Sequence, residues 1–273
     1  MGWEIAGWWA RRSAPISGLP LPSGDVVWTP VDHTDPVLGE VHDVFAARRD
    51  GWITADPSWW ERGGLRRAAG PKPSWSWVGR RGDEPVAMVV YHHADSERGL
   101  DDLEVEYVAG IDGPALRDAL AFLGGHGTTV DRVITTLPER LLAAHVVEGS
   151  RTRTAFDWPW MLRIIDLPGA VAARGWPAGV TGEVHLDVAD PPVVDPAGPT
   201  GPHVLTIDDG TARCEPGGDG TGLRGGGARA ALYAGGADPA ALAFDGALEC
   251  DDDRSLSLLR AAFAGDPTLP IFF

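Results

Sequence analysis

Residues 103–136 read LEVEYVAGIDGPALRDALAFLGGHGTTVDRVITT, and they hold two apolar strand patterns separated by a helical one. Leu103–Val108 predicts a strand because apolar and β-branched residues dominate it. Asp112 and Pro114 then open a helix whose apolar side chains recur at helical spacing. Gly124 and Gly125 end this helix, and Asp131–Thr136 predicts the next strand. The apolar positions of the helix are Leu116, Ala119, Leu120 and Leu123.

Upstream, the pattern adds a hairpin and another helix. Ser74–His92 alternates like two strands around a turn at Arg81–Asp83, and its second strand contains the apolar run Val86–Tyr91. Asp35–Pro36 predicts a helix start, and residues 3–13 predict a strand. Hairpin, strand, helix and strand together predict one mixed α/β domain over residues 26–160.

Downstream, short strands precede short helices, which predicts an α+β domain. Glu183–Ala189 alternates between apolar and polar residues, and Asp209–Gly210 is a hairpin turn. The other expected elements are strands at 161–167, 203–208 and 211–215, a helical turn at 168–174, and helices near 228–235, 238–244 and 253–264, the last with Leu256, Leu259 and Phe263 inward.

Composition limits the function. The 273 residues carry a net charge of −16, which argues against a general nucleic-acid binder. An acidic surface suits a cationic ligand, although most such surfaces serve solubility. The longest apolar runs are too short to span a membrane, and the start lacks a signal-peptide pattern. With only two cysteines, Cys214 and Cys250, we expect a cytoplasmic protein with reduced thiols. One lysine against 22 arginines suits a high-GC bacterial genome.

Local chemical motifs are weak. Gly220–Gly225 matches GxGxxG, but glycine-rich surroundings favour a flexible loop. Arg224 and Gly227 match the start of Arg/Gln-x-x-Gly-x-Gly/Ala, a loop pattern that binds a pyrophosphate. Arg229, however, stands at the last position, where the pattern requires Gly or Ala. His92 and His93 point to opposite strand faces, so we predict a half-exposed pair and no metal site. Four tryptophans, at 59, 60, 75 and 77, are expected in the core or an interface, with an aromatic substrate wall as the alternative.

Several segments together resemble the mycobacterial Eis-like acetyltransferases, the enhanced intracellular survival family. They are GWEIAG at 2–7, the region of Arg48, Arg49 and Gly51 followed by Trp59–Trp60, MLRIIDLPGAVAARGW at 161–176, GEVHLDVADP at 182–191, TARCEP at 211–216, ALYAGGADPAALAFDGAL at 231–248, and the terminal PIFF. The resemblance implies a remnant of a first GNAT domain at 1–25, a second, degenerate GNAT-like domain at 26–160, and a sterol-carrier-protein-like domain at 161–273.

The resemblance also implies a mechanism. In this family the C-terminal carboxylate acts as general base, which is here the carboxylate of Phe273. A free α-carboxylate has a pKa of about 3.3–3.7 and is ionised at neutral pH. It would take a proton from a cationic amine, an aminoglycoside, a polyamine or a lysine side chain, with acetyl-CoA as donor.

The same resemblance predicts that the acetyl-CoA site and the catalytic tyrosine would precede residue 1, so that no cofactor-binding residue falls in this chain. We therefore expect these 273 residues to be inactive or nearly so. A misplaced start is preferred over a natural fragment, because strand 3–13 would otherwise lack sheet partners. The alternative function is a non-catalytic protein that binds an apolar ligand in the sterol-carrier-like domain or serves assembly. A homo-oligomer is expected from the family.

Overall fold

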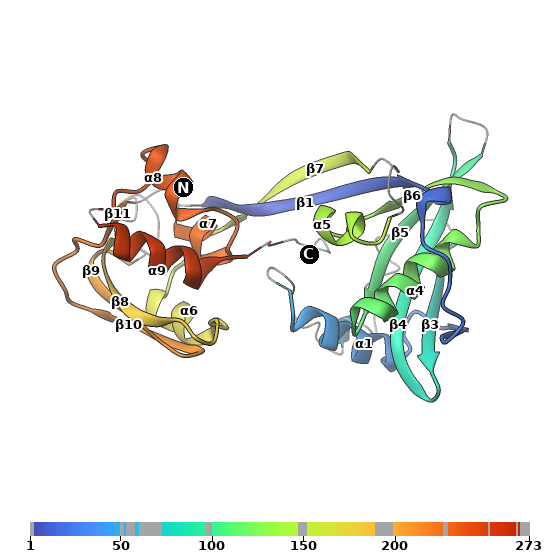
Figure 1. Cartoon of the computed structure of the whole chain (residues 1–273), viewed down its shortest axis with the longest axis horizontal. Helices are drawn as coiled ribbons and strands as arrows, with labels where there is room; N and C mark the ends of the chain where they lie inside the picture. Colours follow the sequence, from blue (N-terminus) through green and yellow to red (C-terminus); the bar gives the residue numbers. More distant parts are fainter. Residues whose placement is uncertain are drawn as a thin grey trace. The chain divides into compact units, whose positions relative to one another are not determined.

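The computed structural model of the chain consists of two compact units (Figure 1). The larger unit is built from Trp9–Trp158, and the smaller unit from residues 3–8 and Pro159–Pro267. The residues described are 3–49, 52, 58–59, 73–96, 100–146, 152–188, 199–225, 229–250, 252–265 and 267. No helix among them is both long and apolar enough to cross a bilayer.

The larger unit contains most of a seven-stranded sheet in the order β2-β3-β4-β5-β6-β1-β7, of which Glu4–Trp8 in β1 and Pro159–Leu162 in β7 belong to the smaller unit. Strands β2 to β5 pair antiparallel, and β5 pairs parallel with β6. Because parallel neighbours need a crossover, helix α4 connects β5 to β6. The strands are β1 (Glu4–Pro15), β2 (Val27–Val31), β3 (Trp75–Arg81), β4 (Glu84–Ala94), β5 (Asp101–Gly110), β6 (Val130–Thr135) and β7 (Arg153–Leu162). The helices are η1 (Ile16–Gly18), α1 (Pro36–Ala46), α4 (Gly113–Gly124) and α5 (Glu139–Ala143).

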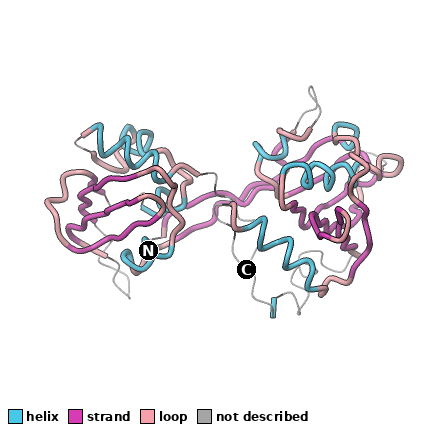
Figure 2. The backbone as a smooth tube through the Cα atoms, turned by 60° about the horizontal axis from the view of Figure 1, so that its bottom comes forward, coloured by secondary structure: helices cyan, strands magenta, loops and turns pink. Residues whose placement is uncertain are grey.

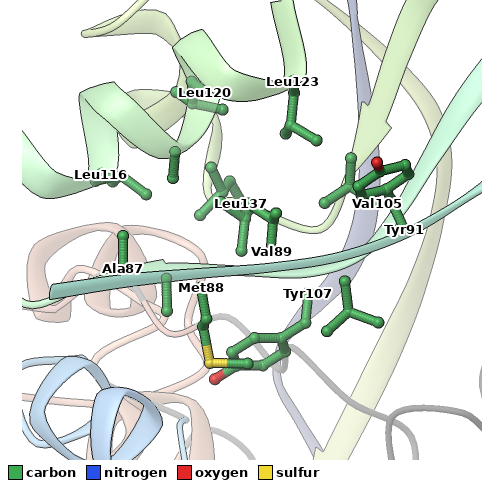
Figure 3. Packing of buried hydrophobic residues seen from close by; sticks show 14 of the residues in the cluster. Ala87, Met88, Val89, Tyr91, Val105, Tyr107, Leu116, Leu120, Leu123 and Leu137 are labelled. Carbon is green, nitrogen blue, oxygen red and sulfur yellow. The ribbon is translucent and has the colours of Figure 1, made fainter. Parts of the chain in front are cut away.

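Helices α1 and α4 bury the core of the larger unit, and Figure 3 shows its packing. The apolar stripe of α4, which includes Leu116 and Leu120, lies over one face of the sheet. Met88 and Tyr107 point to the opposite face. There the Tyr107 hydroxyl forms a hydrogen bond with His42 of α1. The helix predicted from residue 112 onward is therefore confirmed in its bounds and in its inward face.

The smaller unit has a four-stranded sheet in the order β10-β9-β8-β11, with helices beside it (Figure 2). The alternation predicted for β8 is confirmed, because Val184, Leu186 and Val188 are buried. At the β9–β10 turn, Asp209 and Gly210 have φ of 39° and 92°, as a two-residue hairpin requires. The strands are β8 (Thr181–Val188), β9 (Gly201–Asp208), β10 (Thr211–Pro216) and β11 (Leu223–Gly225). The helices are α6 (Leu167–Ala173), α7 (Arg229–Ala234), α8 (Pro239–Phe244) and α9 (Asp253–Phe263).

Two expectations about strands are wrong. Strand β1 does not lack partners, because it lies between β6 and β7, and its residues Arg12–Pro15 pair with β6. The strand expected at 161–167 ends already at Leu162. Asp166 accepts a hydrogen bond from the Gly169 N–H at 3.0 Å, so that Leu167 begins α6 instead.

Candidate functional site

Four ionisable side chains meet on the sheet of the larger unit, and we call them the charged cluster: Arg11, His92, Glu104 and Glu106. The imidazole of His92 on β4 lies between two carboxylates of β5. Its Nδ1 is 2.9 Å from Glu106, and its Nε2 is 3.3 Å from Glu104. Arg11 of β1 approaches Glu104 to 2.9 Å. The cluster thus joins three strands through charged contacts.

A β-bulge makes this meeting possible. In the β4–β5 register His92 is paired with Glu104, whereas Tyr91 is paired with Val105 and Val90 with Tyr107. Glu106 is therefore the extra residue of β5, and its carboxylate reaches the same imidazole as that of Glu104. Bulges are frequent beside functional sites because they redirect a side chain.

Burial gives the charged cluster its acid–base character. It raises the pKa of Glu106 to about 7, with Arg11 opposing the effect and Glu104 adding to it. The side chains of Glu106 and His92 are 12% and 6% exposed, so water screens their contact poorly. Glu106 therefore changes its protonation state near neutral pH, and carboxyl groups shifted in this way are frequent at functional sites.

The same donors bear on metal binding. One atom each of His92, Glu104 and Glu106 lies within 4.8 Å of the others, and imidazole with carboxylates is a donor set for Zn²⁺. Arg11, however, already neutralises Glu104. The expectation of a half-exposed histidine pair is wrong for His92, which is buried. His93 lies apart from the cluster, with its Nδ1 3.3 Å from Asp101.

Helix N-termini are where a pyrophosphate would be held, and the three longest described helices all begin on an aspartate. Asp35 accepts a hydrogen bond from the N–H of Val37 at 3.0 Å, and Asp112 accepts one from Ala115 at 2.7 Å. The third cap pairs Asp252 with the N–H of Ser255 at 2.7 Å. These carboxylates accept hydrogen bonds from backbone N–H groups that a phosphate would need as donors. The three helix N-termini therefore do not fit the pyrophosphate of acetyl-CoA.

Arg81 stabilises Asp112, the aspartate that caps the N-terminus of α4. Its guanidinium lies 3.3 Å from Asp112. Burial alone would raise the pKa of Asp112, but the Ala115 N–H and Arg81 together lower it below its usual value. Asp112 therefore stays ionised at the helix end, where its negative charge is favoured by the dipole and repels an anion.

The GxGxxG segment packs as part of the smaller unit's sheet. Its residues Leu223–Gly225 form β11, which pairs parallel with β8. A Cβ on Gly222 would lie 3.0 Å from the carbonyl oxygen of His185, so this glycine serves close packing. The flexible loop predicted for this segment is therefore wrong at Leu223–Gly225, which form a paired strand. Gly227 of the second pattern lies outside the described residues.

An apolar cavity lies in the core of the smaller unit. It measures about 50 Å³ and is lined by Leu186 and Val188 of β8 and by Leu259 and Phe263 of α9. These are the two elements between which an apolar tunnel is expected if the unit carries a ligand. Ligand pockets typically hold about 300–1,000 Å³, so this cavity accepts at most a small apolar group as it stands.

The remaining predicted residues fall in three places. Phe273, the expected general base, lies outside the described residues, as does Trp60. Trp59 packs against the core of the larger unit. Trp75 is exposed, and Trp77 is half-buried beside Phe122. The charged cluster is not among the sequence-based predictions, although the spacing Glu104-x-Glu106 opposite His92 is a signal for it.

The chain is a two-part protein, in which a mixed sheet with a crossover helix is followed by a separate α+β unit. Residues 51–164 match the family profile described as an acetyltransferase (GNAT) domain, and residues 167–270 match that of a sterol carrier protein domain. The chain therefore combines a GNAT domain with a sterol carrier protein domain.

Several solved structures align with the whole chain. A GCN5-related N-acetyltransferase from Anabaena variabilis aligns with all of this chain and 69% of its own, at a TM-score of 0.87 and 24% identity. A GCN5-related N-acetyltransferase from Kribbella flavida aligns with 100% of this chain and 66% of its own, at a TM-score of 0.76 and 25% identity. Eis1 from Mycobacterium abscessus aligns with 100% of this chain and 69% of its own, at a TM-score of 0.72 and 18% identity. The chain thus spans about two thirds of these proteins. No curated protein matches its sequence.

Proposed function

We propose that the chain belongs to an Eis-like N-acetyltransferase that uses acetyl-CoA to acetylate a cationic amine, such as an aminoglycoside, a polyamine or a lysine side chain. The observation that carries the proposal is the alignment of all 273 residues, across both units, with a GCN5-related N-acetyltransferase at 25% identity. GNAT proteins generally use acetyl-CoA, and their acceptors are amines. The net charge of −16 favours a cationic acceptor.

In this proposal the α-carboxylate of Phe273 is the general base. An amine with a pKa near 10 is mostly protonated at neutral pH and attacks a thioester only after losing that proton. An ionised terminal carboxylate accepts the proton directly or through a water. The assignment rests on the family resemblance of the C-terminal segment.

The proposal places the acetyl-CoA site in a GNAT domain that precedes residue 1. Two observations support it. About a third of the length of the solved structures that align with the whole chain has no counterpart here, and the long helices described here begin on carboxylates rather than open amides. Catalysis needs base, acid and cofactor aligned, so the 273 residues alone are expected to be inactive or nearly so.

The experiment compares this chain with a version extended by the upstream coding sequence, using acetyl-CoA, an aminoglycoside and a thiol-release assay. The extended protein should turn over and the 273-residue chain should not. Turnover of both at similar rates would refute the placement of the cofactor site. No turnover of the extended protein with any aminoglycoside, polyamine or lysine peptide would refute the acetyltransferase itself.

The role of Phe273 has its own test in the extended protein. Replacing the terminal carboxylate by a carboxamide, through intein-mediated ligation, removes the charge and keeps the phenyl ring. Loss of a general base typically costs about 10²–10⁴-fold, so kcat should fall by a factor in this range. Phe273→Leu, which keeps the carboxylate, is the matched control. An amide variant with unchanged kcat would rule out the carboxylate as base.

A second candidate function is non-catalytic binding of an apolar ligand in the smaller unit. The apolar cavity between β8 and α9 favours it, although a ligand larger than a few carbons would have to displace side chains such as Phe263. Deleting Phe273 separates the two functions. Affinity for an apolar probe should be unchanged if the chain is a carrier, whereas turnover of the extended protein should be lost if it is an enzyme. Homo-oligomer formation and the cytoplasmic location stay predictions.

A further inference from the structure

A groove of about 450 Å³ lies in the larger unit, on the α4 face of the sheet near the end of that helix. We call it the aromatic groove. Its lining includes Trp28 of β2, Trp77 of β3, Tyr91 of β4, Phe122 of α4, His126 and Asp118. The volume falls within the roughly 300–1,000 Å³ of small-molecule sites. Three neighbouring strands and one helix thus supply aromatic rings to one concave surface.

Phe122 is the centre of this ring cluster. Its ring is stacked on Trp28, with centroids 4.5 Å apart and planes inclined by 27°. Trp77 packs on it at 5.2 Å. The Tyr91 and His126 rings meet edge to face at 5.0 Å. The rings hold one another in place, so the groove is built before any ligand arrives.

A glycine sets the position of Trp28. The β2–β3 register places Trp28 directly opposite Gly79. A Cβ on Gly79 would lie 3.0 Å from the Trp28 ring and 2.7 Å from the side chain of Val26. Because Gly79 has no side chain, the indole lies against the neighbouring strand and forms one wall of the groove.

The groove carries one formal charge among its described lining residues, and it is negative. Asp118 is buried, and its two oxygens accept hydrogen bonds from the backbone N–H and the hydroxyl of Ser23, each at 2.8 Å. His126 adds no positive charge at neutral pH, because burial, followed by the nearby His93, lowers its pKa. A carboxylate and aromatic rings that line the same groove attract cations and disfavour anions.

We propose that the aromatic groove binds an organic ammonium cation with an apolar body. The rings would contact the cation through their electron-rich faces, and Asp118 would supply the counter-charge. A hydrated inorganic ion would leave the rings unused, and an anion would oppose Asp118. Binding here does not depend on the proposed acetyl transfer, since the groove lies within the larger unit and needs no acetyl-CoA.

The test uses a pair of probes that differ in charge and share a shape: choline and its neutral isostere 3,3-dimethylbutan-1-ol. Benzyltrimethylammonium is the larger cationic probe, and it adds an apolar ring to the quaternary ammonium group. Ligand-observed NMR with the whole chain measures affinity and also the upfield shift that aromatic ring currents impose on the methyl protons. Choline should bind about 3- to 30-fold more tightly than the isostere, the range that a cation–aromatic contact gives. Benzyltrimethylammonium should bind more tightly than either.

Three variants locate the site. Trp77→Leu should weaken binding of benzyltrimethylammonium by about 3- to 30-fold and reduce the upfield shift. Asp118→Asn keeps the size of the side chain and removes its charge. It should weaken the binding of both cations and leave the binding of the neutral isostere unchanged. Trp158→Leu is the control, because Trp158 is 55% exposed and does not line the groove.

Circular dichroism checks that each variant is folded. If Trp77→Leu does not fold, Trp28→Phe replaces it, because it keeps a ring in the wall, and it should weaken binding by a smaller factor. Equal affinity for choline and its isostere would overturn the preference for a cation. Unchanged affinity in the folded groove variants, or no binding of benzyltrimethylammonium at millimolar concentration, would overturn the site.

Discussion

Replacing Glu106 by glutamine tests the acid–base character of the charged cluster. Burial raises the pKa of Glu106 from its ordinary 4.5 to about 7 in the folded protein. One pKa unit corresponds to about 1.36 kcal/mol, so ionising this buried carboxyl lowers the free energy of unfolding by roughly 3 kcal/mol. This figure is an upper bound, because part of the burial effect is offset by charged neighbours such as Arg11.

The sign follows from the raised pKa. The stabilising effect of a protonated Glu106 is complete below pH 4.5 and is lost as the pH rises through about 7. The amide of the Glu106→Gln variant has no such titration. The stability of Glu106→Gln relative to the wild type should therefore increase between about pH 5 and pH 8, by at most roughly 3 kcal/mol.

Urea unfolding followed by circular dichroism at several pH values across this range measures the difference. Glu84→Gln is the matched control, because it is the same substitution at an exposed residue at the start of β4, outside the charged cluster. A constant difference between Glu106→Gln and the wild type over this range would refute the reasoning. A difference of the opposite sign would mean that contacts with His92 and Arg11 outweigh burial.

Three further substitutions test the helix α4. Asp112→Ala removes its N-cap and should lower the free energy of unfolding by about 1 kcal/mol in urea titrations, whereas an unchanged midpoint would mean that the Ala115 hydrogen bond contributes nothing. Leu120→Ala should cost about 2–5 kcal/mol in the same assay, because Leu120 is fully buried, and a cost below about 1 kcal/mol would contradict its place in the core. In Gly110→Ala the new Cβ would lie 2.4 Å from the backbone nitrogen of Leu116, so thermal unfolding should show a lower Tm, and a native Tm would contradict this close approach.

Local patterns predict those elements whose information lies within a few residues. Helix α4 is predictable because a cap, a proline and an apolar stripe at helical spacing all fall within a few turns. The β9–β10 hairpin is predictable because Asp209–Gly210 determines the turn by itself. In both cases backbone preference and burial indicate the same structure.

The pairing of strands that lie far apart in the sequence cannot be predicted from local patterns. Strand β1 pairs with β6, whose residues Arg132–Thr135 lie far along the chain from Arg12–Pro15, so no local pattern indicates which strand covers it. The charged cluster depends on the register of β4 on β5 and on a bulge at Glu106, and a one-residue shift would separate Glu106 from His92. The periodicity within one strand predicts neither the partner of β1 nor the register of β4 on β5.

The helix caps connect the fold to the proposed function. A pyrophosphate and an aspartate compete for the same first-turn amides, and at α4 the aspartate is covalently present and paired with Arg81. A cofactor phosphate would have to displace Asp112 and leave its carboxylate near a second negative group, which is unfavourable at any pH where Asp112 is ionised. The larger unit thus keeps the GNAT architecture with a closed phosphate position at this helix, which supports an acetyl-CoA site elsewhere in the proposed enzyme. Its aromatic groove, lined by aromatic rings and the buried Asp118, has the complementary preference for a cation in our proposal.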